Sequence, residues 1–358
     1  MISLRCFEKE WIDGFRGQKD YEKINPPLLE KMIHALSLLQ HLQTQDIHFT
    51  FKGGTSLMLV LDKATRFSVD IDIITEESRG DIEKALDTVV ETSHFLSWRL
   101  DGQRSYKPGI PKAHYELRYD SQINKNSNYI LLDVLFEKAH YPTIQQRPIQ
   151  SLFIETTTLI PVNVPTVEGI TGDKLTAFAP TTTGILYGKG KELEIVKQLY
   201  DLGNLFDHIQ SLQEVANSFL AFAAKEIAYR SLRIEPADIL RDGLDACRVI
   251  SFRDRSKTEP DISRFNELRR GIASFSEFPV LENFRIDEAI TAAAKVAYLC
   301  AKLLTKDHSP LDRYDHRDLT ELSIQNPQWN ALNKLKRFQD QRAFFYWYRC
   351  LGLLGWIS

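Results

Sequence analysis

The chain has 358 residues, of which 43% are hydrophobic and 26% are charged, and its formal net charge is −3 at pH 7. This composition excludes a wholly disordered chain and a uniformly basic nucleic-acid-binding protein. The four cysteines are widely spaced, with no C-x-x-C pair, which excludes a disulfide scaffold and a zinc ribbon. No apolar leader and no run of about 18 apolar residues occurs, so we expect a cytoplasmic protein that does not cross a membrane.

The first part of the chain mixes two periodicities. Hydrophobic residues recur at helical spacing in some segments and form strand-like runs in others. Helices are predicted at 26–45, 55–61 and 80–94, and strands at 47–51, 69–75, 97–102, 114–120 and 128–137.

From about residue 166 onward the pattern is mostly helical. Strands followed by a run of helices indicate an α+β protein with an appended helical region. We therefore expect one domain over 1–165 and a helical domain over 166–358.

Two aspartates stand out in the strand predicted at 69–75. Asp70 and Asp72 are two residues apart, so strand periodicity points both carboxylates at one face. Paired carboxylates attract a hard divalent cation such as Mg²⁺, which bridges carboxylates to substrate phosphates.

A glycine-rich turn precedes these aspartates. Gly53 and Gly54 let backbone N–H groups approach an anion closely, and Thr55 and Ser56 would begin a short helix. The N-terminus of a helix favours phosphate because its first N–H groups have no partners within the helix. Either motif alone is more often a turn or a solvated strand face, but the two together are much rarer.

This order of strand, Gly-Gly-Thr-Ser turn, short helix and D-x-D strand resembles the nucleotidyltransferase fold. In detail, KGGTSL followed by RFSVDIDI is similar to the AbiEii/MenA-type family of nucleotidyltransferase toxins. The resemblance implies a mixed sheet with flanking helices, and a site where Asp70 and Asp72 hold Mg²⁺ or Mn²⁺. The family usually has an acidic residue where this chain has Val69, which lies on the opposite strand face from the two ligands.

The resemblance extends to two residues in the helical part. The family carries a lysine early in a helix after a V-P-x-x-E segment, then an aspartate in a Y-D-L segment, and Lys174 and Asp201 match these positions. Lys174 would offset the charge that builds on the leaving pyrophosphate. Asp201 could orient Lys174 or contact the ribose or the acceptor. The alternatives are a solvated helix lysine for Lys174, and a helix cap or a helix salt bridge for Asp201.

A third carboxylate is expected at Asp133, the only acid inside the apolar strand at 128–137. An ionised carboxylate is costly to bury without a cation or hydrogen bonds. Asp133 is therefore our candidate metal ligand or general base, with Glu137 as a less favoured substitute. The alternative is an edge strand that exposes Asp133 to water. Arg66 should stabilise the carboxylate pair or contact phosphate, unless it is a surface arginine.

The segment 333–349 predicts a terminal helix with five basic and six aromatic residues. Basic side chains could neutralise RNA phosphates, and aromatic side chains could stack on unpaired bases. The simpler interpretation, which we favour, is that most of the aromatic residues pack the helix onto its domain.

The resemblance implies transfer of a nucleoside monophosphate from a ribonucleoside triphosphate to an acceptor, with the 3′ end of tRNA as that acceptor. It also implies a toxin paired with an antitoxin protein. Two other interpretations stay open: the same chemistry on a protein hydroxyl, and a non-enzymatic RNA- or partner-binding protein with a degenerate cleft. The residues expected to bind the nucleotide are Gly53, Gly54, Thr55, Ser56, Arg66 and Lys174.

Overall fold

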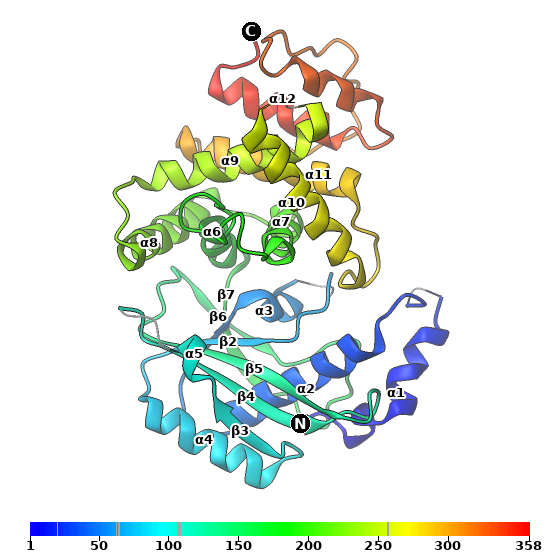
Figure 1. Ribbon diagram of the computed structural model, residues 1–358, viewed down its shortest axis with the longest axis vertical. Helices are drawn as coiled ribbons and strands as arrows, with labels where there is room; N and C mark the ends of the chain where they lie inside the picture. The colour runs from blue at the N-terminus through cyan, green and yellow to red at the C-terminus, as the bar shows by residue number, and fades with distance from the viewer. Residues whose placement is uncertain (20, 62, 64, 106–108, 256–257) are drawn as a thin grey trace. The chain divides into compact units, whose positions relative to one another are not determined.

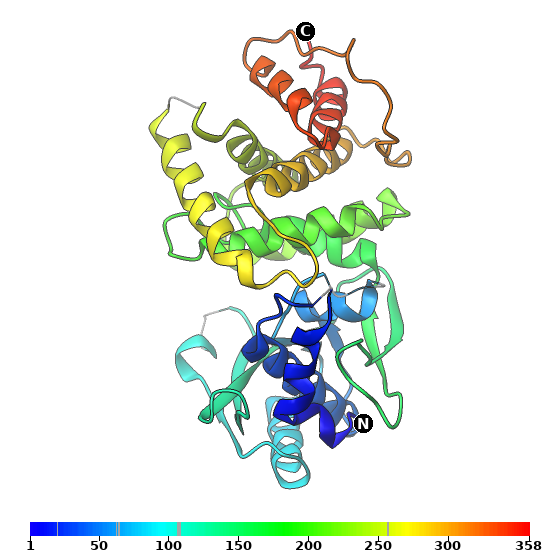
Figure 2. The ribbon, with the colours of Figure 1, turned by 90° about the vertical axis from the view of Figure 1, so that its right-hand side faces the viewer.

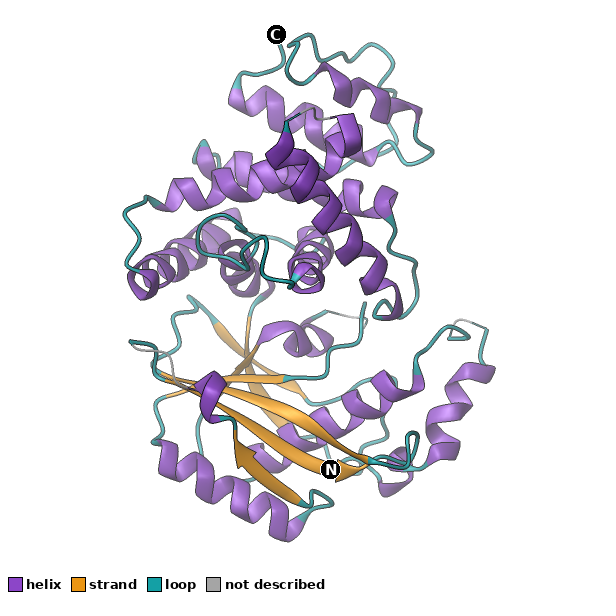
Figure 3. Ribbon diagram, in the orientation of Figure 1, coloured by secondary structure: helices purple, strands orange, loops and turns teal. Residues whose placement is uncertain are grey.

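The computed structural model describes residues 1–358 except 20, 62, 64, 106–108 and 256–257. The chain forms two compact units. The first consists of Met1–Thr166 and Glu277–Glu282, and the second of Val167–Ser276 and Asn283–Ser358. Within the described residues, all the strands belong to the first unit, whereas the regular structure of the second is helical (Figure 3).

A five-stranded mixed sheet organises the first unit. Its strands are β1 (Thr50–Lys52), β2 (Ile71–Thr75), β3 (Ser97–Leu100), β4 (Lys112–Asp120) and β5 (Ser127–Phe136). Their order is β1-β2-β5-β4-β3, with β5 in the centre (Figure 1). Only β2 and β5 are parallel; the other neighbours are antiparallel. The predicted mixed sheet with flanking helices is confirmed.

Two long helices cover one face of this sheet. The helices of the first unit are α1 (Lys9–Gly14), α2 (Pro26–Gln43), α3 (Gly53–Val60), α4 (Arg79–Thr92) and α5 (Gly102–Ser105). Tyr119 of β4 stacks on His34 of α2, and the hydroxyl of Tyr115 donates to Glu83 of α4. Because residues 115 and 119 share one face of β4, α2 and α4 lie on the same side of the sheet. The other face carries His114.

Local signals explain where α2 begins. Asn25 is its N-cap, and the side-chain oxygen of Asn25 accepts from the backbone N–H of Leu28. Pro26 and Pro27 occupy the first turn, where a missing N–H costs no helical hydrogen bond. The predicted start of this helix is therefore confirmed.

Helices α6 (Val167–Ala177), α7 (Glu192–Phe206), α8 (Leu212–Arg230), α9 (Pro236–Phe252), α10 (Glu259–Ser274), α11 (Ile286–Leu304) and α12 (Arg342–Leu354) build the second unit. Helix α11 packs against α7, α9 and α12, and Figure 2 shows it in orange beside α12 in red. Most of α11 is buried around its whole circumference, as is typical of a central core helix.

Six residues from late in the chain pack within the first unit. The backbone N–H of Phe67 donates to the carbonyl of Phe278 at 2.8 Å, and that of Val280 donates to the carbonyl of Thr65 at 3.0 Å. The segment Glu277–Glu282 therefore holds the residues that lead into the D-x-D sequence.

Several predicted boundaries are wrong. The strand predicted at 47–51 is Thr50–Lys52, and the helix predicted at 55–61 begins at Gly53, so β1 leads directly into α3. The strand predicted at 69–75 begins at Ile71, so Asp70 precedes it. The single helix predicted at 333–349 is divided into a 3₁₀ helix, Asn330–Arg337, and α12. At the break, the carboxylate of Asp340 accepts from the backbone N–H of Arg342 at 3.0 Å, a local side-chain bond that competes with a continuous helix.

The packing role of the terminal aromatic residues is confirmed, because Phe344, Phe345, Tyr346 and Trp347 are all buried. The sequence did not predict β6 (Ile144–Pro148) and β7 (Pro161–Pro165), which form a separate antiparallel pair. The residues of β6 are mostly exposed, so they lack the hydrophobic alternation that marks a strand. No helix in the described part of the chain is both long enough and apolar enough to span a membrane.

Candidate functional site

A row of four polar residues crosses the sheet on the face opposite α2 and α4. Lys52 on β1 pairs with Asp72 on β2, Asp72 pairs with Asp133 on β5, and Asp133 pairs with His114 on β4. Residues directly opposite each other on neighbouring strands project to the same face. The register therefore brings together Asp72 and Asp133, which are far apart in the sequence. The edge-strand interpretation of Asp133 is wrong, because β5 is the central strand.

Asp72 lies against the first residue of α3. Gly53 has a φ of +76°, and a Cβ built there would lie 2.0 Å from Oδ2 of Asp72. Glycine is needed at this position both for its backbone conformation and for the space that the carboxylate occupies. The D-x-D strand and the N-terminus of α3 therefore meet at one point.

Arg66 occupies the space beside the next glycine. A Cβ on Gly54 would lie 2.4 Å from Nη2 of Arg66, and Nη1 of Arg66 donates to the carbonyl of Phe67 at 3.0 Å. Arg66 is only 6% exposed, so the surface-arginine interpretation is wrong. Its guanidinium places a permanent positive charge at the N-terminal turn of α3.

Thr55 and Ser56 are both fully buried. The hydroxyl of Thr55 donates to the backbone carbonyl of Asp70 at 2.5 Å, and the hydroxyl of Ser56 donates to that of Gly53 at 2.8 Å. Both hydroxyl protons therefore hold the turn together. The first turn of α3 can offer an anion its backbone N–H groups, beside the guanidinium of Arg66. Asp70 lies before β2, so strand periodicity alone does not fix the direction of its carboxylate.

Asp133 lies among cationic and hydrogen-bonding groups. One carboxylate oxygen pairs with Nδ1 of His114, and the other lies 3.8 Å from Nη2 of Arg104. These partners supply what the sequence argument required of an acid inside an apolar strand. Glu137 follows the end of β5, and its carboxylate lies 3.8 Å from Nε2 of His140.

Lys174 and Asp201 form a buried ion pair in the second unit. Nζ of Lys174 lies 2.7 Å from Oδ2 of Asp201 and donates to Oε1 of Gln198 at 3.1 Å. Lys174 is 6% exposed and Asp201 is fully buried, so the solvated-lysine interpretation is wrong. The ion pair is what both an Asp201 that orients Lys174 and a salt bridge between helices would show.

The carboxylates of the first unit are suited to binding a hard cation, but they do not supply all the ligands that the cation needs. Among the described residues, no group of three or more His, Cys, Asp or Glu side chains could hold a metal ion. Mg²⁺ in nucleotide enzymes commonly takes only one or two carboxylates and completes its shell with substrate phosphates and water. Asp72 and Asp133, on adjacent strands and one sheet face, fit that pattern, with Asp70 close in sequence.

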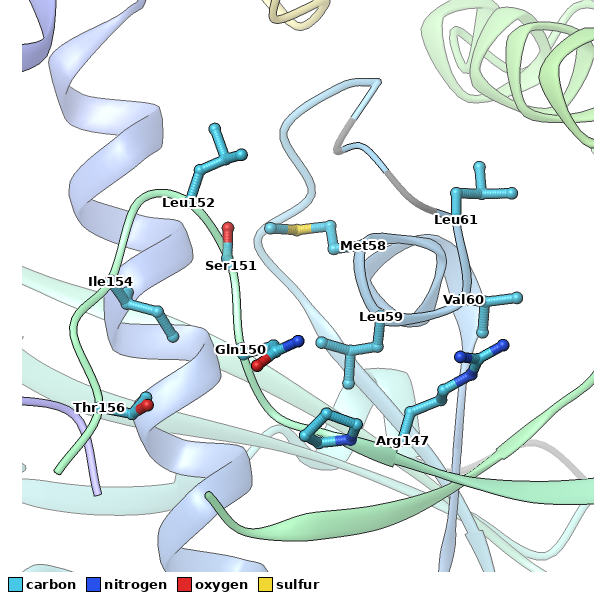
Figure 4. Close-up of a pocket in the computed structure, with 11 residues that line it drawn as sticks. Met58, Leu59, Val60, Leu61, Arg147, Gln150, Ser151, Leu152, Ile154 and Thr156 are labelled. Carbon is cyan, nitrogen blue, oxygen red and sulfur yellow. The ribbon is translucent and has the colours of Figure 1, made fainter. Parts of the chain in front are cut away.

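A separate cavity of about 480 Å³ lies beside the C-terminal half of α3. Figure 4 shows Met58 and Leu59 pointing from this helix toward the loop that carries Gln150 and Ser151. None of the predicted site residues is among its described lining residues. This cavity is therefore distinct from the carboxylate row.

Two members of the row, Lys52 and His114, were not predicted from the sequence. The alternation in β4 was a usable signal, since Lys112, His114, Glu116 and Arg118 occupy every second position. It predicts a polar face but not which strand lies opposite. Only the pairing register identifies Asp133 as the neighbour of His114.

A family model described as "Nucleotidyl transferase AbiEii toxin, Type IV TA system" matches residues 37–268. No curated protein matches the sequence. Among solved structures, JHP933 from Helicobacter pylori is 15% identical with a TM-score of 0.44, and the match covers 80% of this chain and 97% of that one. A provisionally named nucleotidyltransferase from H. pylori is also 15% identical with a TM-score of 0.44, covering 78% and 96%.

Proposed function

The chain belongs to the AbiEii family of nucleotidyltransferase toxins of type IV toxin–antitoxin systems, and from this premise we propose that it transfers a nucleoside monophosphate from a ribonucleoside triphosphate to an acceptor hydroxyl. Pyrophosphate is the leaving group. The observation that carries the proposal is the contact between Asp72 and Gly53, because it places a carboxylate beside the N-terminus of α3. A metal–triphosphate complex needs both groups at the same point.

Each residue has a distinct part in this reaction. Asp70, Asp72 and Asp133 would hold Mg²⁺ or Mn²⁺, which when bound offsets the negative charge of the triphosphate. The N–H groups of Gly54, Thr55 and Ser56 bind phosphate oxygens.

Arg66 adds positive charge to the same turn. Lys174, oriented by Asp201, comes from the second unit to the same triphosphate and stabilises the departing pyrophosphate. The meeting of Lys174 with the aspartates of the first unit is part of the proposal.

The acceptor that we propose is the 3′-terminal hydroxyl of tRNA, as the family resemblance implies. Transfer to that hydroxyl would block aminoacylation and so explain a toxic effect. An antitoxin protein encoded separately is the expected partner of the family.

Label transfer tests this function. The protein is incubated with each of the four α-labelled ribonucleoside triphosphates, Mg²⁺, total RNA and cell lysate, and the RNA and protein fractions are separated. We expect label in the tRNA band together with pyrophosphate release. Label in protein alone would replace the RNA acceptor with a protein hydroxyl, and no transfer with any nucleotide would contradict the proposed activity.

The variant Asp72→Asn separates site chemistry from folding. We expect it to lower transfer by at least about 100-fold, because it removes a charged ligand from the site while keeping the shape of the side chain. Its thermal unfolding should stay close to that of the wild type. Transfer at the wild-type rate would remove Asp72 from the site.

A further inference from the structure

His114 contacts Asp133 from the neighbouring strand β4. It lies directly opposite Asp133 in the β4–β5 register, and its Nδ1 forms a hydrogen bond with Oδ1 of Asp133. The side chain of His114 is only 9% exposed, whereas that of Asp133 is 26% exposed. The histidine therefore supports the carboxylate from the protein interior.

The orientation of the His114 ring is fixed on both of its nitrogens. Nζ of Lys112 lies 2.9 Å from Nε2 of His114. A lysine ammonium can only donate, so Nε2 accepts, and the proton of the neutral ring is on Nδ1, where it is donated to Asp133. Lys112 thus selects the tautomer that can bind the carboxylate.

The backbone around His114 is fixed as well. The N–H of His114 donates to the hydroxyl of Ser105 at 2.9 Å, and its carbonyl accepts from the N–H of Asp101 at 2.8 Å. These bonds fix the strand on the side away from β5. The ring therefore has little freedom to follow Asp133 if that carboxylate moves.

We propose that His114 is a positioning residue that holds one oxygen of Asp133, so that the carboxylate is presented to the cation bound beside Asp72. This proposal rests on the proposed function. Groups that orient a ligating carboxylate or histidine through a hydrogen bond commonly contribute 10- to 100-fold to metal affinity or activity. The second oxygen of Asp133, 3.8 Å from Arg104, is the one that His114 leaves for the site.

The two His114 variants differ in whether they keep a hydrogen-bond donor near the position of Nδ1. His114→Phe keeps an aromatic ring in the same space and removes the donor. His114→Asn places an amide N–H close to the position of Nδ1, so it should restore the bond to Asp133. Glu116→Gln is the matched control: Glu116 lies on the same face of β4, two residues farther along, and pairs with Arg99 at 2.7 and 2.9 Å.

The primary measurement is the affinity of the nucleotide-free protein for Mn²⁺, followed by electron paramagnetic resonance of free Mn²⁺. We expect His114→Phe to weaken binding by about 10- to 100-fold and His114→Asn to stay within a few-fold of the wild type. Glu116→Gln should leave Mn²⁺ affinity unchanged. Where transfer is measurable, His114→Phe should lower kcat more than it raises KM.

Wild-type Mn²⁺ affinity in a folded His114→Phe protein would overturn the proposal, as would an equal loss in His114→Asn. If His114→Phe does not fold, the variant Lys112→Met tests the proposal instead. Without Lys112 the tautomer of His114 is no longer selected, so Mn²⁺ binding should weaken although His114 stays in place. Unchanged affinity in Lys112→Met would then overturn the proposal. An inactive wild type that still shows these Mn²⁺ effects would reject the proposed reaction but keep the role of His114.

Discussion

Gly53 connects backbone conformation to site geometry at the level of one residue. Its φ of +76° is unfavourable for residues with a Cβ, and that Cβ would overlap Asp72. Gly188 offers a natural comparison, since its φ of +71° is similar and nothing lies within 4 Å of the position of a Cβ. Both glycines have the same backbone requirement. A carboxylate occupies the position of a Cβ at Gly53, whereas at Gly188 that position is open and the backbone N–H donates to the carboxylate of Glu267.

The substitution Gly188→Ala should lower the free energy of unfolding by about 1–2 kcal/mol, the usual cost of this backbone region. Gly53→Ala should cost more and should also abolish nucleotide transfer, because Asp72 must move. Urea unfolding and label transfer measure the two effects. Equal stability losses, with transfer intact in both variants, would show that the contact with Asp72 is unimportant.

The Lys174–Asp201 pair combines structure with the proposed chemistry. Replacing one member leaves the other buried without a counter-charge, so Asp201→Asn should lower the free energy of unfolding by about 3–5 kcal/mol. The double variant Lys174→Met/Asp201→Asn removes both charges and should recover at least half of that loss.

Nucleotide transfer measured on the same variants separates the role of the ion pair in stability from its role in catalysis. The double variant should be folded but inactive, because it lacks the cation that stabilises the leaving group. A double variant that transfers nucleotide at the wild-type rate would show that the pair serves stability alone.

At the scale of elements, α2 and the segment that follows α4 meet through a pair of histidines. Nδ1 of His34 lies 2.8 Å from Nε2 of His94, and the ring of His34 stacks on Tyr119. Burial, and then the neighbouring His94, hold the pKa of His34 well below its ordinary value. Burial, with His41 as a smaller cause, lowers the pKa of His94 to about 4. Both rings are therefore neutral in the folded protein near neutral pH.

This pair should make the first unit sensitive to acid. Between the ordinary histidine pKa of about 6.5 and a pH of about 4, the unfolded chain binds protons that the folded chain excludes, so stability falls as the pH falls. The contribution of His94 is of the order of 3 kcal/mol by pH 4. His94→Gln should reduce the loss of stability between about pH 7 and about pH 4.5.

Urea unfolding at the two pH values measures this difference. His208→Gln is the control, because His208 is exposed and lies in the second unit. If His94→Gln and His208→Gln lose as much stability on acidification as the wild type, the buried pair does not cause the acid sensitivity.

At the scale of the whole molecule, the sequence predicts those features that are set by residues close together in the chain. The helix at α2, the short helix that follows β1 and the strand containing Asp133 follow from periodicity and from residues such as Pro26. The contact of Lys174 with Asp201 also agrees with one of the alternatives drawn from the sequence.

Features that depend on pairing between distant segments could not be predicted. The placement of His114 opposite Asp133 depends on the β4–β5 register. The backbone hydrogen bond between Phe67 and Phe278 joins residues more than two hundred positions apart in the sequence. The protons of Thr55 and Ser56 bind backbone carbonyls, which their residue types alone do not reveal.

The central claim is that the aspartates of the first unit and Lys174 of the second act on one metal–triphosphate complex. The most direct test is nuclear magnetic resonance of the protein with ¹³C-labelled lysine, the Lys174 signal being assigned from Lys174→Arg, with Mn²⁺ and a non-hydrolysable triphosphate added. We predict that Mn²⁺ broadens the Lys174 signal in the wild type and not in Asp72→Asn. A Lys174 signal that stays sharp while Mn²⁺ broadens the Lys52 signal would contradict the claim.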